Sequence, residues 1–369
     1  MVYATGCINH NNYAYILELL EEEVSITIKD IAKEAGVTPS TVSRVINNNK
    51  VISEKTRKKV QQVMKDMHFH PNSLARNLSN QSTSNIALLV DIDSNDKFTN
   101  PFFYEELHGI EQVVYNSGYF LMLANEATFS HTHNNAIDQI VFEKRVDGVI
   151  IPPSIADKEL IERLNKINFP FVVAGKPQFY REETDWVDID NTMGGYLGVE
   201  HLNRQGYHNI AFIGGNQADQ FNQDRLTGYK KGLETAHMTE NKEYMCECTD
   251  ISVEAGTHAA QDLLALKNPP DSIICCHNLL AYGAMEAISA QGLQIPQDIG
   301  LLSFDNYPLA DFVKPKLTII DIDVYKLGIE TANLLMRRIH DKGCAPSHFL
   351  IQTKVIERAS TKKYEANIQ

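Results

Sequence analysis

The sequence predicts an α/β protein with an all-α head and a body of two Rossmann-like lobes. Three observations predict this class. The length of 369 residues exceeds that of one ordinary domain. From residue 85 onward, short β-branched runs alternate with helical patterns, whereas residues 24–80 show helical patterns and turn signals with almost no strand. The body contains more such runs than a single sheet of ordinary size accommodates, so we expect two sheets.

The predicted strands of the body are short apolar runs rich in Val, Ile and Leu. They lie at residues 85–92, 119–125, 146–153, 170–175, 209–215, 271–276, 299–304 and 317–322. Helical patterns lie at residues 101–117, 133–145, 158–167, 193–206, 220–236, 252–266, 278–292 and 323–341. Strands that alternate with helices in this way pair in parallel and are covered by helices on both faces. The polar segment 79–85 is the expected linker between head and body.

The composition is that of an ordinary globular protein, with 43% hydrophobic and 22% charged residues. The longest apolar runs, such as 86–90 and 149–153, are far shorter than the roughly 18–20 residues of a spanning helix, which predicts a soluble protein. Residues 1–23 lack the basic start and apolar block of a secretory signal. We therefore expect a cytoplasmic protein whose 6 cysteines are free thiols, since none lies in a zinc-binding pattern.

Charge is distributed unevenly along the chain. The net charge is −13, yet residues 24–84 contain ten Lys and Arg against four Asp and Glu, a net of +6. Residues 85–369 carry a net of −15. The sequence therefore combines a small basic head with a large acidic body, and the head is the part that suits contact with nucleic acid.

Residues 27–48 contain the signature of a helix-turn-helix. Two short helical patterns flank a turn in which Gly36 can end the first helix at positive φ. Thr38 is a favourable N-cap, and Pro39 stands at the favoured first position of the second helix. The polar residues of this second helix would face a DNA groove, namely Ser40, Thr41, Ser43, Arg44 and Asn47. Among them, Arg44 can bind a guanine edge through two hydrogen bonds.

Two further helical segments complete the head. Residues 53–67 predict a third helix, and its basic run 57–59, which begins with Arg57, would dock on phosphates. Residues 70–80 predict a fourth helix, which is shorter than the ~12 residues that an isolated helix needs in water. We expect this helix to fold only against DNA and a partner chain, with an exposed leucine inserted into the minor groove.

The residues of the head resemble the DNA-binding signature and hinge helix of the lac repressor (LacI/GalR) family of bacterial transcription regulators, in the segments TIKDIAKEAGVTPSTVSRVIN and HPNSLARNL. The resemblance covers nearly all of residues 26–361 and implies a repressor that binds palindromic operator DNA as a homodimer. It makes Leu78 the minor-groove wedge. The residues expected to contact DNA are Thr27, Thr38, Pro39, Ser40, Thr41, Ser43, Arg44, Asn47, Arg57, Asn72, Ala75 and Leu78. Pro39 and Ser40 depart from the bulkier residues of some members, so the operator sequence stays open.

The resemblance also implies the fold and role of the body. Sensor domains of this family are similar to periplasmic sugar-binding proteins and hold a small-molecule effector between two lobes. The corresponding ligand-binding residues here are Phe102, Phe103, Arg225, Asn278 and Asp305. Aromatic faces and convergent polar groups suit a sugar. The segments VVAGKPQ, VDIDN and NQDRLTGY are most similar to the maltose-operon repressor branch, which implies maltose or a malto-oligosaccharide.

Two alternatives to a sugar-responsive repressor stay open. One is a regulator that uses a purine or a protein corepressor, and the other is a cytoplasmic sugar-binding protein without DNA function. An enzyme is not expected, because the glycine pair in AFIGGN is neither a dinucleotide nor a phosphate-binding fingerprint and no nucleophile elbow is present. His201 and His208 lack the spacing of metal ligands. We therefore expect no metal and no cofactor.

The predicted domain boundaries follow from these segments. The successive parts are an extension at 1–23, the helix-turn-helix domain at 24–69, the hinge helix and linker at 70–84, the ligand-binding and dimerisation domain at 85–361 and a tail at 362–369. The N-lobe would comprise about 85–206 and 321–346, and the C-lobe about 207–320 and 347–361. The extension lies outside the family pattern, and a misplaced start, with translation from Val24, is an open alternative for it.

Overall fold

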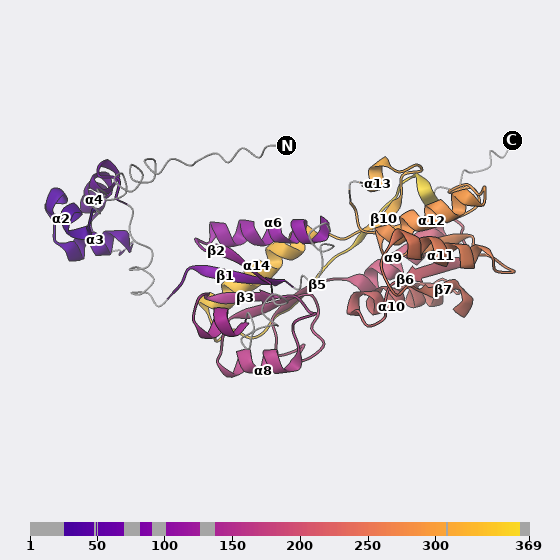
Figure 1. Ribbon diagram of the computed structural model, residues 1–369, viewed down its shortest axis with the longest axis horizontal. Helices are drawn as coiled ribbons and strands as arrows, with labels where there is room; N and C mark the ends of the chain where they lie inside the picture. Colours follow the sequence, from indigo (N-terminus) through magenta and orange to yellow (C-terminus); the bar gives the residue numbers. More distant parts are fainter. Residues whose placement is uncertain are drawn as a thin grey trace, which may run out of the picture. The chain divides into compact units, whose positions relative to one another are not determined.

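The computed structural model describes residues 26–47, 49, 51–69, 82–90, 101–125, 137–307 and 309–361. The chain divides into two compact units, the head up to Ser82 and the body from Thr83 onward (Figure 1). This division falls within the predicted linker. The predicted extension, hinge helix and tail lie outside the described residues.

The described residues of the head form three helices: α2 (Ile28–Ala35), α3 (Pro39–Ile46) and α4 (Glu54–Asp66). They share a small apolar core made of Ile31, Ala32, Ala35, Val42, Val45 and Val60. Gly36 ends α2 in the left-handed region at φ 62°, where a side chain would be strained. The glycine therefore permits the sharp turn after which α3 begins only three residues later.

The part of the body that the structure describes contains two six-stranded sheets (Figure 1). The first sheet has the order β11-β5-β4-β3-β1-β2 and is parallel throughout. Its strands are β1 (Asn85–Val90), β2 (Phe120–Asn125), β3 (Gly148–Ile151), β4 (Phe171–Ala174), β5 (Trp186–Ile189) and β11 (His348–Ile351). Along β1, Ile86 and Leu88 enter one apolar core while Ala87 and Leu89 enter another. Burial on both faces explains the uninterrupted apolar run of this strand.

Helices cover both faces of the first sheet. Helices α6 (Pro101–Asn116) and α14 (Val324–His340) pack together on one face, and α8 (Lys158–Lys166) lies on the other. The helical pattern predicted at 133–145 gives, in its described part, only a short π-helical turn, η2 (Asp138–Phe142), because Lys144 leaves the helical region at φ 54°. Of the helices that the structure describes, none is long and apolar enough to cross a membrane.

The second sheet has the order β12-β10-β9-β8-β6-β7. Its strands are β6 (Ile210–Gly214), β7 (Met245–Glu247), β8 (Ser272–Cys275), β9 (Gly300–Phe304), β10 (Thr318–Asp321) and β12 (Lys354–Ile356). All pairings are parallel except that of β12 with β10. The packed helix pairs of this lobe are α9 (Asn191–Arg204) with α10 (Gln220–Thr235), and α11 (Val253–Leu264) with α12 (Asn278–Ala290). The two remaining short segments are η3 (Lys242–Tyr244) and α13 (Leu309–Phe312).

Two segments belong to a different lobe from the one predicted. Helix α9 packs on α10 and contacts β8, β10 and β12, so it belongs to the C-lobe and not to the N-lobe. Strand β11 pairs with β5, so it completes the N-lobe. An amphipathic pattern shows that a helix has a buried face but not which sheet covers it. The chain therefore crosses between the lobes three times, at residues 190, 322–323 and 352–353.

Helices α9 and α10 approach each other so closely that their backbones touch. A Cβ added at Gly195 would lie 2.1 Å from the carbonyl O of Arg225, and one added at Gly228 would lie 1.9 Å from the carbonyl O of Thr192. Both positions therefore need glycine for reasons of space. The contact fixes the position of Arg225 on α10 relative to the start of α9.

Candidate functional site

The exposed face of α3 carries most of the polar residues predicted to contact DNA. Exposed or half-buried on this helix and its ends are Ser40, Thr41, Ser43, Arg44 and Asn47, together with the N-cap Thr38 and Pro39. The hydroxyl of Thr38 accepts a hydrogen bond from the backbone N–H of Thr41 at 3.3 Å. The side chain of Arg44 forms no hydrogen bond or ion pair with the described part of the chain, so its guanidinium is available to a ligand.

Two of the predicted DNA contacts also hold the head together. The backbone N–H and the hydroxyl of Thr27 donate to the carboxylate of Asp30 at 2.8 and 2.6 Å, which forms a capping box and lowers the pKa of Asp30. Arg57 donates to the carbonyl of Asn49 at 2.9 Å and lies 3.4 Å from the carboxylate of Glu54. Its side chain is only 15% exposed. To contact a phosphate as predicted, Arg57 would therefore have to give up its contacts with Asn49 and Glu54.

The remaining basic residues of α4 stay exposed, namely Lys55, Lys58, Lys59 and Lys65. They supply the positive surface that the charge distribution predicted. The predicted hinge residues Asn72, Ala75 and Leu78 lie outside the described residues.

Replacing Arg44 by alanine is expected to weaken specific operator binding about 10- to 100-fold, because a two-bond guanidinium contact with guanine is worth about 1–3 kcal/mol. The melting temperature should not change, since the side chain has no partner in the described head. Fluorescence anisotropy with an operator duplex and a scrambled duplex at one salt concentration measures the effect. Lys65→Ala, which removes an exposed charge from α4, is the matched control. Equal weakening on both duplexes would contradict a base contact.

In the body, three of the predicted ligand residues meet at the carboxyl ends of parallel strands. Asn278 follows β8, Asp305 follows β9, and Arg225 reaches them from α10. The Nη2 atom of Arg225 lies 3.7 Å from Oδ1 of Asp305, and the two side chains are only 5% and 3% exposed. Open α/β sheets bind ligands at such strand ends. We call the group formed by Asn191, Arg225, His277, Asn278 and Asp305 the strand-end site.

Arg225 is held by several partners at once. Its Nε donates to Oδ1 of Asn191 at 2.8 Å, its Nη1 donates to the carbonyl of Cys276, and its guanidinium stacks on the ring of Phe304 at 4.1 Å from the centroid. A buried charge is tolerated only with such partners. The donors of Arg225 are therefore fixed in direction before any ligand arrives.

Asp305 is shared between Arg225 and His277, which the sequence did not single out. Nε2 of His277 lies 3.5 Å from Oδ2 of Asp305, while Nδ1 accepts from the backbone N–H of Leu279 at 3.3 Å. Because Nδ1 is an acceptor, Nε2 carries the proton of the neutral ring and faces the carboxylate. Burial lowers the pKa of His277, which favours this neutral form. Asp305 also has φ 72°, a region that non-glycine residues rarely adopt and that is typical of functional sites.

The two predicted aromatic residues lie in the first turn of α6 and are half-buried against the core. The backbone of Phe102 interacts with the hydroxyl of Tyr307, which follows Asp305 by two residues. Burial raises the pKa of Tyr307, so this hydroxyl stays protonated. Phe103 packs edge to face with Tyr104 of the same helix, with centroids 5.8 Å apart. The structure therefore brings Phe102 toward the strand-end site more directly than Phe103.

A polar network joins the two lobes beside this site. Nζ of Lys176, which follows β4, lies 3.0 Å from Oδ2 of Asp224 on α10. Nη2 of Arg181 donates to Oε1 of Gln220 at 3.1 Å, and Nε2 of Gln220 donates to Oδ1 of Asp224 at 2.9 Å. Nothing in the sequence signalled this network, because its members come from segments far apart in the chain. The network therefore connects the N-lobe to the C-lobe through charged and amide side chains.

Two further carboxyl groups are half-buried on the N-lobe side of the network. Burial raises the pKa of Asp188 on β5 to about 6, and the charge of Asp224 adds to this effect. Burial, followed by the charge of Asp188, raises the pKa of Glu106 on α6 to about 7. Glu106 therefore keeps its proton at pH values at which an exposed glutamate has already lost it.

The body is expected to lose stability as the pH rises from about 5 to about 8. The folded chain keeps the proton of Glu106 up to about pH 7, whereas the unfolded chain releases it near 4.5. Because the folded state then binds more protons, the free energy of unfolding falls through this window. Glu106→Gln should remove much of the slope and stabilise the protein at pH 8 by on the order of 2 kcal/mol. Melting temperatures at the two pH values test this, with the exposed Glu111→Gln as control; an unchanged slope in E106Q would refute it.

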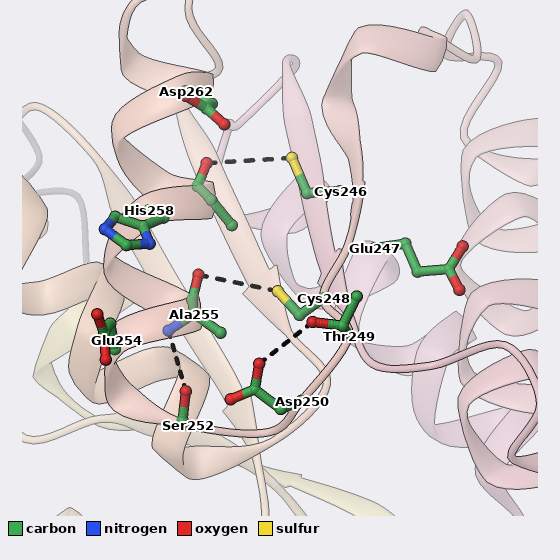
Figure 2. Close-up of a pocket in the computed structure, with 11 residues that line it drawn as sticks. Cys246, Glu247, Cys248, Thr249, Asp250, Ser252, Glu254, Ala255, His258 and Asp262 are labelled. Carbon is green, nitrogen blue, oxygen red and sulfur yellow. Dashed lines mark hydrogen bonds between the residues drawn. The ribbon is translucent and has the colours of Figure 1, made fainter.

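A separate cavity of about 560 Å³ lies between β7 and α11, and none of its lining residues belongs to the strand-end site (Figure 2). The thiol of Cys246 on β7 points toward the carbonyl of Ala259 on α11 at 4.0 Å, and the thiol of Cys248, which directly follows β7, points toward the carbonyl of Ala255 at 3.8 Å. Burial raises the pKa of Cys248 to about 11, so this thiol is a poor nucleophile at neutral pH. Within the described ranges, no group of three or more His, Cys, Asp or Glu has the geometry to hold a metal ion.

The head and the body together define a class of protein. A helix-turn-helix with an exposed polar face is joined to two open α/β lobes that hold a preorganised charged site at their strand ends, as in a DNA-binding regulator controlled by a small molecule. The model of bacterial regulatory proteins of the lacI family matches residues 27–72, and the model of the periplasmic binding protein-like domain matches residues 199–361.

Curated relatives agree with this class. The HTH-type transcriptional repressor PurR of Photobacterium profundum is 32% identical over 343 residues, covering 91% of this chain and 98% of that protein. The repressor of the same name from Vibrio cholerae serotype O1 is 31% identical, with 91% and 98% covered. The chain belongs to the lacI family of bacterial regulatory proteins and is a DNA-binding transcriptional repressor.

Solved structures confirm the predicted fold. A complex of the transcriptional regulator CelR with cellobiose is 26% identical, with a TM-score of 0.66 over 91% of this chain and 99% of that one. A lacI-type regulator from Bacillus cereus subsp. cytotoxis is 31% identical, with a TM-score of 0.67 over 75% and 98%. The lac repressor dimer bound to operator and the anti-inducer ONPF has a TM-score of 0.73 over 91% and 99%, and at 24% identity it supports the fold alone.

Proposed function

We propose that this repressor controls a carbohydrate-utilisation operon in the cytoplasm and binds a sugar, maltose or a malto-oligosaccharide, as its effector. The strand-end site carries this proposal. The fixed donors of Arg225, the carboxylate of Asp305 and the amide of Asn278 converge at one sheet edge, close to the aromatic first turn of α6. Convergent planar polar groups beside an aromatic surface suit the hydroxyl arrays and apolar faces of a sugar.

A purine is the second candidate effector. The relatives named PurR favour it, because they are similar to this chain over nearly their whole length. A purine base is also planar and would stack on an aromatic ring. The strand-end site alone does not distinguish a sugar from a purine, so both classes of compound are needed in an effector titration.

The effector would act by linking the lobes. A ligand at the strand ends contacts Arg225 and Asp305 of the C-lobe and, on the other side, the first turn of α6 in the N-lobe. Because only three short segments connect the lobes, such a ligand can change their relative orientation. In a homodimer on a palindromic operator, this change would alter the spacing of the two hinge helices predicted at residues 70–80. Operator and effector affinities are then coupled, and the coupling is reciprocal.

Operator titration with and without effectors tests this function. Fluorescence anisotropy measures binding of the full-length protein to DNA from its own upstream region, with maltose, maltotriose, galactose, guanine and hypoxanthine added in turn. We expect specific binding that one malto-sugar changes at least about tenfold. A shift by a purine alone would replace the sugar with the second candidate. Absence of specific DNA binding would contradict the regulator.

A further inference from the structure

The loop between β4 and β5 is anchored to the N-lobe. The backbone N–H of Gly175 donates to the carbonyl of Val187 at 2.7 Å, and the indole N–H of Trp186 donates to the carbonyl of Arg181 at 2.9 Å. Trp186 is buried in an apolar core of this lobe. Within the loop, Nε of Arg181 donates to the carbonyl of Pro177 at 2.7 Å. The side chains that project from this loop therefore start from a defined position on the N-lobe.

Two side chains of this loop form the polar network with α10 of the C-lobe. Lys176 pairs with Asp224, and Arg181 donates to Gln220. Gln220 lies one turn before Asp224 and donates to its other carboxylate oxygen, so both oxygens of Asp224 have partners. We call these four residues the lobe latch. Because each lobe supplies two of them, the contacts that join the two halves depend on how the lobes are oriented.

The ion pair of the lobe latch is shielded from water more than an ordinary surface pair is. The side chains of Lys176 and Asp224 are 24% and 15% exposed, with 3.0 Å between Nζ and Oδ2. By contrast, the side chains of Lys230 and Glu240, which both belong to the C-lobe, are 43% and 45% exposed and 3.4 Å apart. Exposed pairs contribute little to stability, whereas a lower local dielectric strengthens the attraction between charges. The lobe latch can therefore favour one relative orientation of the lobes over others.

The covalent connection between the lobes is short at each of its three crossings, which lie at residues 190, 322–323 and 352–353. The backbone N–H of Asp190 donates to the carbonyl of Ile351 at 2.9 Å, which joins the first crossing to the strand that precedes the third. A rotation of one lobe against the other bends these crossings and separates the two halves of the lobe latch. Exchange of the backbone amides at the crossings therefore reports how often the lobes leave the latched orientation.

We infer that the lobe latch selects one relative orientation of the lobes through the chain's own side chains, before an effector acts. This role does not depend on which effector binds, so it goes beyond the proposed function. Asp224 directly precedes Arg225 on α10, so a ligand that moves Arg225 also moves one half of the latch. The effector then shifts an equilibrium whose starting point the latch sets, by its difference in affinity between the orientations. Lys176 and Asp224 are positioning residues in this role and need no contact with the effector.

A double-mutant cycle on the full-length protein, followed by hydrogen–deuterium exchange, tests the lobe latch without DNA or effector. The variants are Lys176→Met, Asp224→Asn and the two combined. Each single variant should speed exchange at least about threefold in segments 188–192, 321–325 and 350–355, because the latched orientation is lost more often. The combined variant should exchange no faster than Lys176→Met alone, since the ion pair is already broken.

Glu240→Gln is the matched control, because it breaks an ion pair within one lobe and should leave exchange at the crossings unchanged. An equal rise in this control, or faster exchange confined to the loop after β4 and the start of α10, would overturn the inference. Additive effects of the two substitutions at the crossings would overturn it as well. Failure of the regulator proposal would appear separately, as absence of specific DNA binding by the wild type, and would leave the exchange results standing.

Discussion

The Arg225→Met variant is expected to lose at least about 100-fold in effector affinity while it still binds operator DNA. Methionine preserves much of the side-chain length but removes every donor and the positive charge. Asp305 is then left as a buried carboxylate whose remaining close partner is the neutral His277. Removing one member of a buried ion pair typically destabilises a protein by about 3–5 kcal/mol. Isothermal titration with the effector and thermal unfolding measure the two effects.

A double variant separates the loss of binding from the loss of stability. Arg225→Met combined with Asp305→Asn removes the unpaired charge, so it should recover most of the stability but none of the effector response. The exposed Lys230→Met on the same helix is the control for a changed surface. If R225M keeps the wild-type effector response, the effector binds elsewhere, and the strand-end site is only structural.

The second large effect is expected for Gly228→Ala. The added Cβ would lie 1.9 Å from the carbonyl O of Thr192, and a backbone atom cannot move aside as a flexible side chain can. Helices α9 and α10 must then separate, at a cost of about 3 kcal/mol or more. Arg225 lies one turn before Gly228 on α10, so its hydrogen bond to Asn191 on α9 should lengthen too. We expect a lower melting temperature together with weaker effector binding.

The matched control for this variant is Lys231→Ala, on the exposed side of α10. It should change the free energy of unfolding by no more than about 0.5 kcal/mol. Circular dichroism melts and effector titrations compare the two variants. A G228A protein as stable as K231A would show that α9 and α10 can move apart freely, and the close contact would then have no role in placing Arg225.

Most interior strands of both sheets were predictable because both of their faces are buried, but the interior strand β5 was missed. Strand β1, with its run of buried residues, stands out in the sequence for this reason. The edge strands β7 and β11 give no such signal, since β11 exposes three of its four residues and β7 is only partly covered. The short β12 pairs with a single neighbour and was missed in the same way.

The site residues that lie in family motifs were predictable. Those whose role depends on contacts formed only in the folded structure were not. Arg225 and Asp305 lie in segments that resemble family blocks, and the structure brings them together. Asn191 and His277 were missed, although each lies two residues after an apolar strand, a position that could have marked them. The carboxyl groups of Glu106, Asp188 and Asp224 gave no signal, because residues far apart in the chain influence each other only when α6, β5 and α10 are assembled.

The order in which the chain is synthesised determines when each lobe of the body can fold. The N-lobe starts with β1 at residue 85 but receives its last helix and strand, α14 and β11, only after β6 to β10 have been synthesised. A nascent chain that stops after β10 lacks α14 and β11 in one lobe and β12 in the other. Incomplete sheets of this kind expose apolar surface and unpaired edges. Neither lobe can therefore be completed early in translation, and a prematurely terminated product is a substrate for chaperones and proteases rather than a half-active sensor.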